Sequence, residues 1–183
     1  MEADWEFQVG GDAPVIEAYW SGFVDLRAHP ERVPELIECC ELPALADVLI
    51  RLNSANSPAW TSKTDIFTPD HIDLDEMHAT AESAVHAIAC YIDLLRADSI
   101  WHLPSNMERD CKEICAELRT SVLRCCRIDI VVRKALVADI DHLGATVYFT
   151  ACGPTLADAK NRLGECLVTF TQAMVSRPQE KTG

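Results

Sequence analysis

Residues 126–152 contain two runs in which apolar and polar side chains alternate, and this pattern constrains the fold more than any other feature of the sequence. The first run sets Ile128, Ile130 and Val132 against Arg127, Asp129 and Arg133, and the second sets Val147, Phe149 and Ala151 against Thr146, Tyr148 and Thr150. Successive side chains of a strand point to opposite faces of a sheet, so both runs predict strands with one buried face. With Gly144 opening the second strand, they predict a hairpin whose loop holds Asp139, Asp141 and His142.

Two helices are predicted around this hairpin. Thr155, with Asp158 three residues later, forms a capping pattern ahead of an apolar face that runs from Leu156 to Met174. Ser105 and Glu108 form a capping box before a second helix, whose apolar face includes Cys111 and Leu118. Helices that follow strands in this way predict a mixed α+β fold.

Residues 84–95 leave two alternatives open. Val85, Ile88, Ile92 and Leu95 fit one face of a helix, but the same β-branched residues also suit a central strand. If the segment is a strand, residues 84–176 form a ferredoxin-like βαββα sandwich with a mainly antiparallel sheet. If it is a helix, three helices pack on the hairpin.

The N-terminal part is predicted to be acidic and mostly helical. Trp5, Phe7 and Val9 suggest a short strand, and helices are expected over about 14–26, 33–40 and 45–52. A short strand is expected over 63–68. The chain is therefore interpreted as one α+β domain over 1–183, with an acidic helical segment at 1–58, the sheet and its packing helices at 59–176, and a frayed tail at 177–183.

Charge is distributed unevenly along the chain. Residues 1–100 hold 19 Asp and Glu against 5 Lys and Arg, whereas residues 101–183 hold 10 against 11. Phosphate contacts need basic clusters, so direct nucleic-acid binding is not expected. The acidic half favours a basic protein partner, with Glu31, Glu35, Glu38 and Glu41 as the contact residues. A homodimer is an alternative, in which basic residues of one copy dock on the acidic half of the other. These basic residues are Arg119, Arg124, Arg127, Arg133 and Lys134.

The sequence contains nine cysteines but no C-x-x-C pair. This arrangement favours free, mostly buried thiols in a reducing compartment over a disulfide framework or a zinc ribbon. No apolar run approaches the length of a membrane span, and the acidic N-terminus differs from a secretory signal. The expected location is the cytoplasm, without a membrane partner.

The stretch NSANSPAWTSKTDIF at 53–67 is the predicted ligand site. Lys63 is the only lysine among the first hundred residues, and it lies beside Trp60, Thr61, Ser62 and Asp65. An aromatic ring, hydroxyl groups and a cation so close together could bind an anionic or ring-bearing ligand. The turn at Gly153 and Thr155, where a strand leads into a helix, could complete the site with backbone N–H groups. In a regular strand, Thr61, Lys63 and Asp65 would share one face.

Other chemistry has weaker support in the sequence. The acidic turn at 70–78 contains metal-ligand types, but it lacks the glycine of a calcium loop, and neither a metal nor a cofactor is expected. No spacing selects a nucleophile with its base, so catalytic residues are unknown.

Two hypotheses for function follow. The preferred one is a non-catalytic acidic binding or accessory protein, inhibitor-like or immunity-like, that contacts a basic partner. The alternative is a domain that binds an anionic small molecule, or an enzyme, with its site around Trp60–Asp65.

Overall fold

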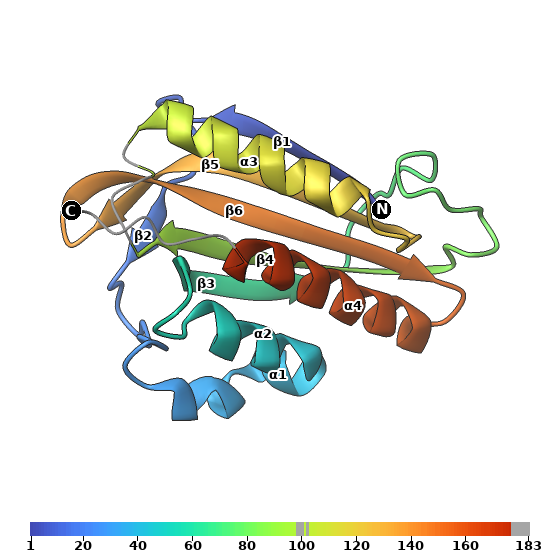
Figure 1. Cartoon of the computed structure of the whole chain (residues 1–183). Helices are drawn as coiled ribbons and strands as arrows, with labels where there is room; N and C mark the ends of the chain where they lie inside the picture. Colours follow the sequence, from blue (N-terminus) through green and yellow to red (C-terminus); the bar gives the residue numbers. More distant parts are fainter. Residues whose placement is uncertain (98–100, 102, 177–183) are drawn as a thin grey trace.

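A computed structural model describes residues 1–97, 101 and 103–176. Its centre is one open, mostly antiparallel sheet in the order β1-β5-β6-β4-β3 (Figure 1). The short strand β2 continues the β1 edge by pairing with the far end of β5, and both β1 and β2 run parallel to β5. The strands are β1 (Glu2–Gln8), β2 (Ile16–Ala18), β3 (Ala59–Phe67), β4 (His86–Arg96), β5 (Cys126–Val137) and β6 (Ile140–Gly153).

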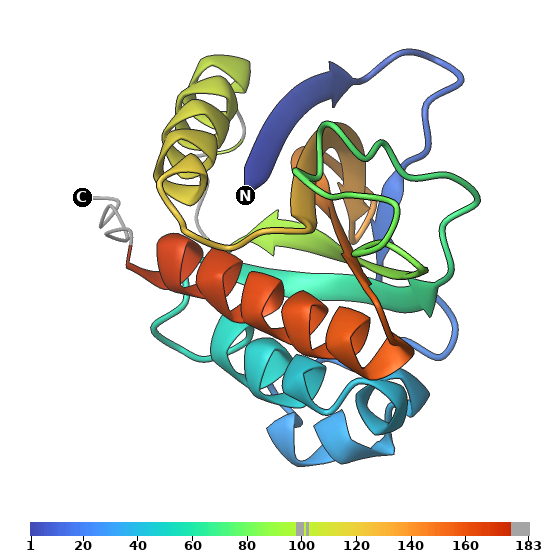
Figure 2. The ribbon, with the colours of Figure 1, turned by 90° about the vertical axis from the view of Figure 1, so that its right-hand side faces the viewer.

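Helices cover one face of this sheet. Figure 2 shows α3, α4 and α2 on the same side, whereas the connecting segments 10–28 and 68–85 lie on the other side. The helical elements are η1 (Pro30–Glu35), α1 (Ile37–Glu41), α2 (Ala44–Leu52), α3 (Pro104–Arg119) and α4 (Leu156–Val175). The fold is therefore a mixed α+β architecture with one helix-covered face and one helix-free face.

The main core lies between the helices and the sheet. Alternate residues of β4, β5 and β6 point into it, including Ile92, Ile130 and Val147, and each of these three is almost fully buried. Phe149 on β6 meets Phe170 on α4 edge-to-face, with ring centroids 5.2 Å apart. The predicted hairpin strands and the capped C-terminal helix are confirmed.

Residues 86–95 of the 84–95 segment belong to strand β4, which resolves the alternatives that the sequence left open. β4 lies inside the sheet between β3 and β6. Ala89 and Leu95 face away from the helices, yet both are buried. Apolar side chains on both faces explain why the segment lacks a clear alternating pattern.

The predicted helix over 14–26 is wrong, and the N-terminal helical segment is not confirmed because the sheet begins at Glu2. Residues 16–18 form β2, and positive φ angles at Tyr19 (65°) and Gly22 (94°) turn the chain afterwards. The aromatic residues with helical spacing instead pack around a strand: Phe23 and Tyr19 each have ring centroids 6.3 Å from that of Trp60. Tertiary packing on Trp60 thus overrides the local pattern.

Two local predictions also need correction. Helix α3 begins at Pro104, with proline in its first turn and no side-chain cap, so Ser105 is not an N-cap.

Gly144 does not open β6. The hairpin turns at Ala138 and Asp139, which both have positive φ, so Asp141 and His142 are in the strand. Gly144 is needed inside β6, because an added Cβ would lie 2.9 Å from the carbonyl oxygen of Leu94.

His102 and the predicted frayed tail at 177–183 lie outside the described residues. Within residues 1–97, 101 and 103–176, no helix combines the length and hydropathy that crossing a membrane requires. All nine cysteines are free, and only Cys40 is exposed. The prediction of free, mostly buried thiols is confirmed.

Candidate functional site

A cavity of about 430 Å³ lies on the helix-free face of the sheet. This volume is within the usual range of small-molecule sites. Four neighbouring strands form its floor, and the segment that contains β2 forms one side. The lining residues are Pro14, Val15, Ile16, Glu17, Trp20, Lys63, Tyr91, Asp93, Arg133, Thr146 and Tyr148.

The floor follows from strand alternation. Ile92 on β4 and Val147 on β6 point toward the helices, so their sequence neighbours Tyr91, Asp93, Thr146 and Tyr148 face the cavity. The register places Tyr91 opposite Tyr148 and Asp93 opposite Thr146. The two tyrosine rings have centroids 6.0 Å apart. A pair of phenol rings therefore lies next to a carboxylate and a hydroxyl group.

Arg133 of β5 is the most unusual group in the cavity. Only 9% of the residue is exposed, and its Nε has no hydrogen-bond partner among the described residues. Its Nη2 donates to the Tyr148 hydroxyl oxygen at 3.0 Å. Buried polar groups are nearly always hydrogen-bonded, because an unmade bond costs about 1–3 kcal/mol. An unsatisfied guanidinium N–H at a cavity is the kind of donor that a ligand would satisfy.

Lys63 reaches the cavity from β3. The nearby Tyr91 hydroxyl raises the pKa of Lys63. Burial raises the pKa of Tyr91, and Lys63 partly opposes that shift. The lysine is therefore cationic and held at the rim of the cavity, while its side chain remains exposed.

Asp93 lies between these two cations. Its Oδ1 accepts a hydrogen bond of 2.6 Å from the Thr146 hydroxyl. Burial raises the pKa of Asp93, although the Thr146 bond and the charges of Arg133 and Lys63 oppose the shift. A carboxyl group in this state can hold a proton or bind a cationic group.

The predicted site around Trp60–Asp65 is only partly brought together. Register shifts between Thr61 and Thr64, as at a β-bulge, so Thr61 and Lys63 do not share a face as a regular strand would require. Thr61 is hydrogen-bonded to Asn53, and the Ser62 hydroxyl donates to the Glu17 carbonyl. Asp65 is exposed, and its carboxylate accepts from the Ile66 backbone N–H.

Trp60 also lies outside the cavity. Only 4% of it is exposed, and it packs with Ile16, Leu95 and Ala135. Arg27 covers its ring, with Cζ 3.8 Å from the centroid. Trp60 thus holds the β2 segment against the sheet, and of the five residues predicted in this stretch only Lys63 lines the cavity.

Gly153 and Thr155 do not join the cavity either. Gly153 ends β6, about 17 Å along the strand from Tyr148 at the usual rise per residue. The Thr155 hydroxyl accepts from the Asp158 backbone N–H at 3.1 Å, so it acts as the helix N-cap. An added Cβ at Gly153 would lie 2.7 Å from the Ala159 backbone nitrogen, so close packing accounts for this glycine.

The predicted acidic contact residues lie on η1 and α1, away from the cavity. The Glu31 carboxylate lies 3.2 Å from Nδ1 of His29, and Glu35 forms an ion pair with Arg32 at 3.0 Å. Glu41 is exposed and Glu38 is partly buried. These contacts do not test whether the four residues bind a partner.

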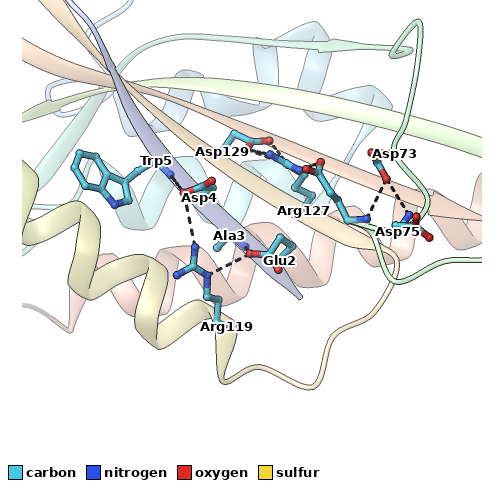
Figure 3. A network of polar contacts seen from close by, with 10 residues as sticks. Glu2, Ala3, Asp4, Trp5, Asp73, Asp75, Arg119, Arg127 and Asp129 are labelled. Carbon is cyan, nitrogen blue, oxygen red and sulfur yellow. Dashed lines mark hydrogen bonds and ion pairs between the residues drawn. The ribbon is translucent and has the colours of Figure 1, made fainter.

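Several basic residues of the second half are paired within the chain (Figure 3). Arg119 of α3 reaches Glu2 at 3.2 Å and Asp4 at 3.7 Å on β1. Arg127 pairs with Asp129 at 2.7 Å and with Glu76 from the 68–85 segment. Arg133, by contrast, is not in an ion pair with any described residue, which sets it apart from these two arginines.

Backbone hydrogen bonds to a side chain hold the acidic turn at 70–78. Asp73 accepts the backbone N–H groups of Asp75 and Glu76 at 2.9 and 3.2 Å (Figure 3). No group of three or more His, Cys, Asp or Glu side chains in the described part of the chain is arranged to hold a metal ion.

The sequence prediction missed Tyr91, Asp93, Arg133, Thr146 and Tyr148 as site residues. The outward face of the predicted hairpin could have identified three of them, because it already contained Arg133, Thr146 and Tyr148. Their convergence with Lys63 depends on the strand order.

No model of a known protein family, no curated protein and no solved structure matches this chain.

Proposed function

We propose that this protein binds a small molecule with an anionic group in the cavity on the helix-free face. One observation carries the proposal: Arg133 is buried at the cavity with its Nε unsatisfied. Arginine presents several N–H donors in a planar fork, and carboxylates and phosphates accept two of them together. Lys63 supplies a second cation at the rim.

The remaining walls suit a small organic molecule better than a bare ion. Tyr91, Tyr148 and Trp20 offer aromatic surface, and Val15 and Pro14 offer aliphatic surface. A bare anion would leave most of the 430 Å³ filled with water. An anionic molecule with an apolar body uses both parts of the wall.

The test is a native mass spectrum of the protein purified gently from its own host. A mass increment of a few hundred daltons or less on the wild-type chain supports the proposal. The Arg133→Met and Lys63→Met variants should lose this increment, Arg133→Met more completely. Arg51→Met, on the exposed face of α2, is the matched control and should keep it. An increment that all variants retain, or none in any sample, would contradict the proposal.

Binding of a basic protein through Glu31, Glu35, Glu38 and Glu41 stays a proposal of lower rank. Glu31 and Glu35 already have partners within the chain. A protein partner or a second copy of this chain would appear in the same mass spectrum as an increment of protein size.

The finer description of the fold belongs to this proposal as well. The order β4-α3-β5-β6-α4 and the adjacency of β5, β6 and β4 support a ferredoxin-like unit, to which β3 adds an edge strand. In this arrangement the helices occupy one face and leave the other for the ligand.

A further inference from the structure

The charges around the cavity are balanced. Lys63 and Arg133 are cationic, whereas Asp93 and Glu17 carry carboxyl groups. A ligand that carries only a negative charge would be attracted by Arg133, but the Asp93 carboxylate would repel it. A ligand with both a negative and a positive group would satisfy both sides, so the charge pattern fits a zwitterion better than a simple anion.

The two groups of opposite charge that would bind the ligand lie on different strands. Arg133 lies on β5 and Asp93 on β4, with β6 between them. The Arg133 charge acts on Asp93, yet the guanidinium is bonded to Tyr148 and the carboxylate to Thr146. The two opposite charges thus line one cavity while each is bonded to a neutral hydroxyl group, which leaves room for a ligand to bridge them.

Lys63 does not neutralise Asp93 directly. Among the described residues it forms no ion pair with Asp93, and Tyr91 influences the pKa of Lys63 more than Asp93 does. A partly buried carboxylate that is not bonded to a cation is strongly stabilised when a ligand supplies an ammonium group.

From this arrangement we propose that the ligand is an α-amino acid with an apolar or aromatic side chain. Arg133 holds its carboxylate, Asp93 accepts a hydrogen bond from its ammonium group, and the walls at Tyr91, Tyr148 and Trp20 contact its side chain. The inference rests on the proposed function, because it takes Arg133 as the anion-binding residue.

Isothermal titration calorimetry with matched compounds tests the inference on the wild-type protein. L-phenylalanine, L-leucine and L-tryptophan are compared with acids that lack the amino group (3-phenylpropionate, 4-methylpentanoate and indole-3-propionate). The same amino acids are compared with amines that lack the carboxylate (phenethylamine, 3-methylbutylamine and tryptamine). At least one amino acid should bind roughly tenfold or more tightly than both of its analogues, since each analogue lacks one of the two charge-assisted hydrogen bonds.

The variants assign the two ends of the ligand. Asp93→Asn should remove the advantage of the amino acid over its deaminated acid, while the acid still binds. Arg133→Met should weaken binding of both compounds. The Arg51→Met control should behave as wild type. The wild-type comparison alone remains decisive if Asp93→Asn does not fold.

The outcomes separate the two proposals. If the deaminated acids bind as tightly as the amino acids and depend on Arg133, the zwitterion inference is overturned and anion binding stands. If no amino acid binds at millimolar concentration, the inference is overturned. The mass increment and its dependence on Arg133 then decide the proposed function separately.

Discussion

At the scale of single residues, the site depends on which charged side chains are paired within the chain. Arg127 and Arg133 both point outward from β5, but Arg127 is paired with Asp129 and Glu76, whereas Arg133 has one hydrogen bond to the described part of the chain, with the Tyr148 hydroxyl. The two arginines look alike in the sequence. The neighbouring strands and the 68–85 segment decide which of them a ligand can use.

Asp93 leads to a prediction about pH. Its pKa in the folded protein is raised above the ordinary value by burial. The folded state therefore holds this proton more tightly than the unfolded state, and Asp93 lowers stability as pH rises from about 4 through its folded pKa. Asp93→Asn removes this penalty, so the melting temperature of the variant relative to wild type should increase between about pH 4 and pH 7.

The check is a series of thermal melts of both proteins across this pH range. Asp70→Asn, at an exposed position in a loop, is the matched control and should show a smaller change with pH. A difference between Asp93→Asn and wild type that stays constant with pH would show that the carboxyl group titrates alike in the folded and unfolded states.

At the scale of elements, the two long helices begin in different ways although the sequence suggests similar caps. Thr155 caps α4 by accepting from the Asp158 backbone N–H. Ser105 has a similar pattern, but α3 begins one residue earlier at Pro104 and has no side-chain cap. Proline is well suited to the first turn of a helix, because its fixed φ matches and its missing N–H would have no partner there.

Matched alanine substitutions test this difference. Thr155→Ala should lower the free energy of unfolding by about 1 kcal/mol, the usual contribution of an N-cap. Ser105→Ala should change it by less than about 0.5 kcal/mol, as expected for an exposed residue without a cap bond. Urea denaturation measures both values. Equal losses for the two variants would mean that Ser105 caps α3 in solution.

At the scale of the whole molecule, the sheet separates the main core from the cavity. The helices and the main core lie on one face, and the cavity lies on the other beside the segment that contains β2. The 10–28 segment reaches that position because Tyr19, Phe23 and Arg27 pack on Trp60. The 53–67 stretch thus contributes to the site mainly by anchoring this segment, and of its residues only Lys63 lines the cavity.

The net charge of −13 leads to a prediction at this scale. Repulsion among like charges disfavours the compact state, and salt screens it. Raising NaCl from about 0.02 M to about 0.3 M shortens the Debye length from roughly 20 Å to about 6 Å. The melting temperature should therefore increase with NaCl in differential scanning calorimetry. A decrease would indicate that ion pairs such as Arg127 with Asp129 outweigh the repulsion.

The sequence by itself determined the hairpin strands, the capped helix α4, helix α2 and the free thiols, because each depends on local periodicity, capping or composition. Tertiary structure alone decided that 84–95 is a central strand, that 14–26 is not a helix, and that Lys63, Asp93 and Arg133 line the same cavity. These features depend on contacts between segments far apart in the chain. The strand order and the packing on Trp60 set these contacts, and no local sequence pattern specifies either of them.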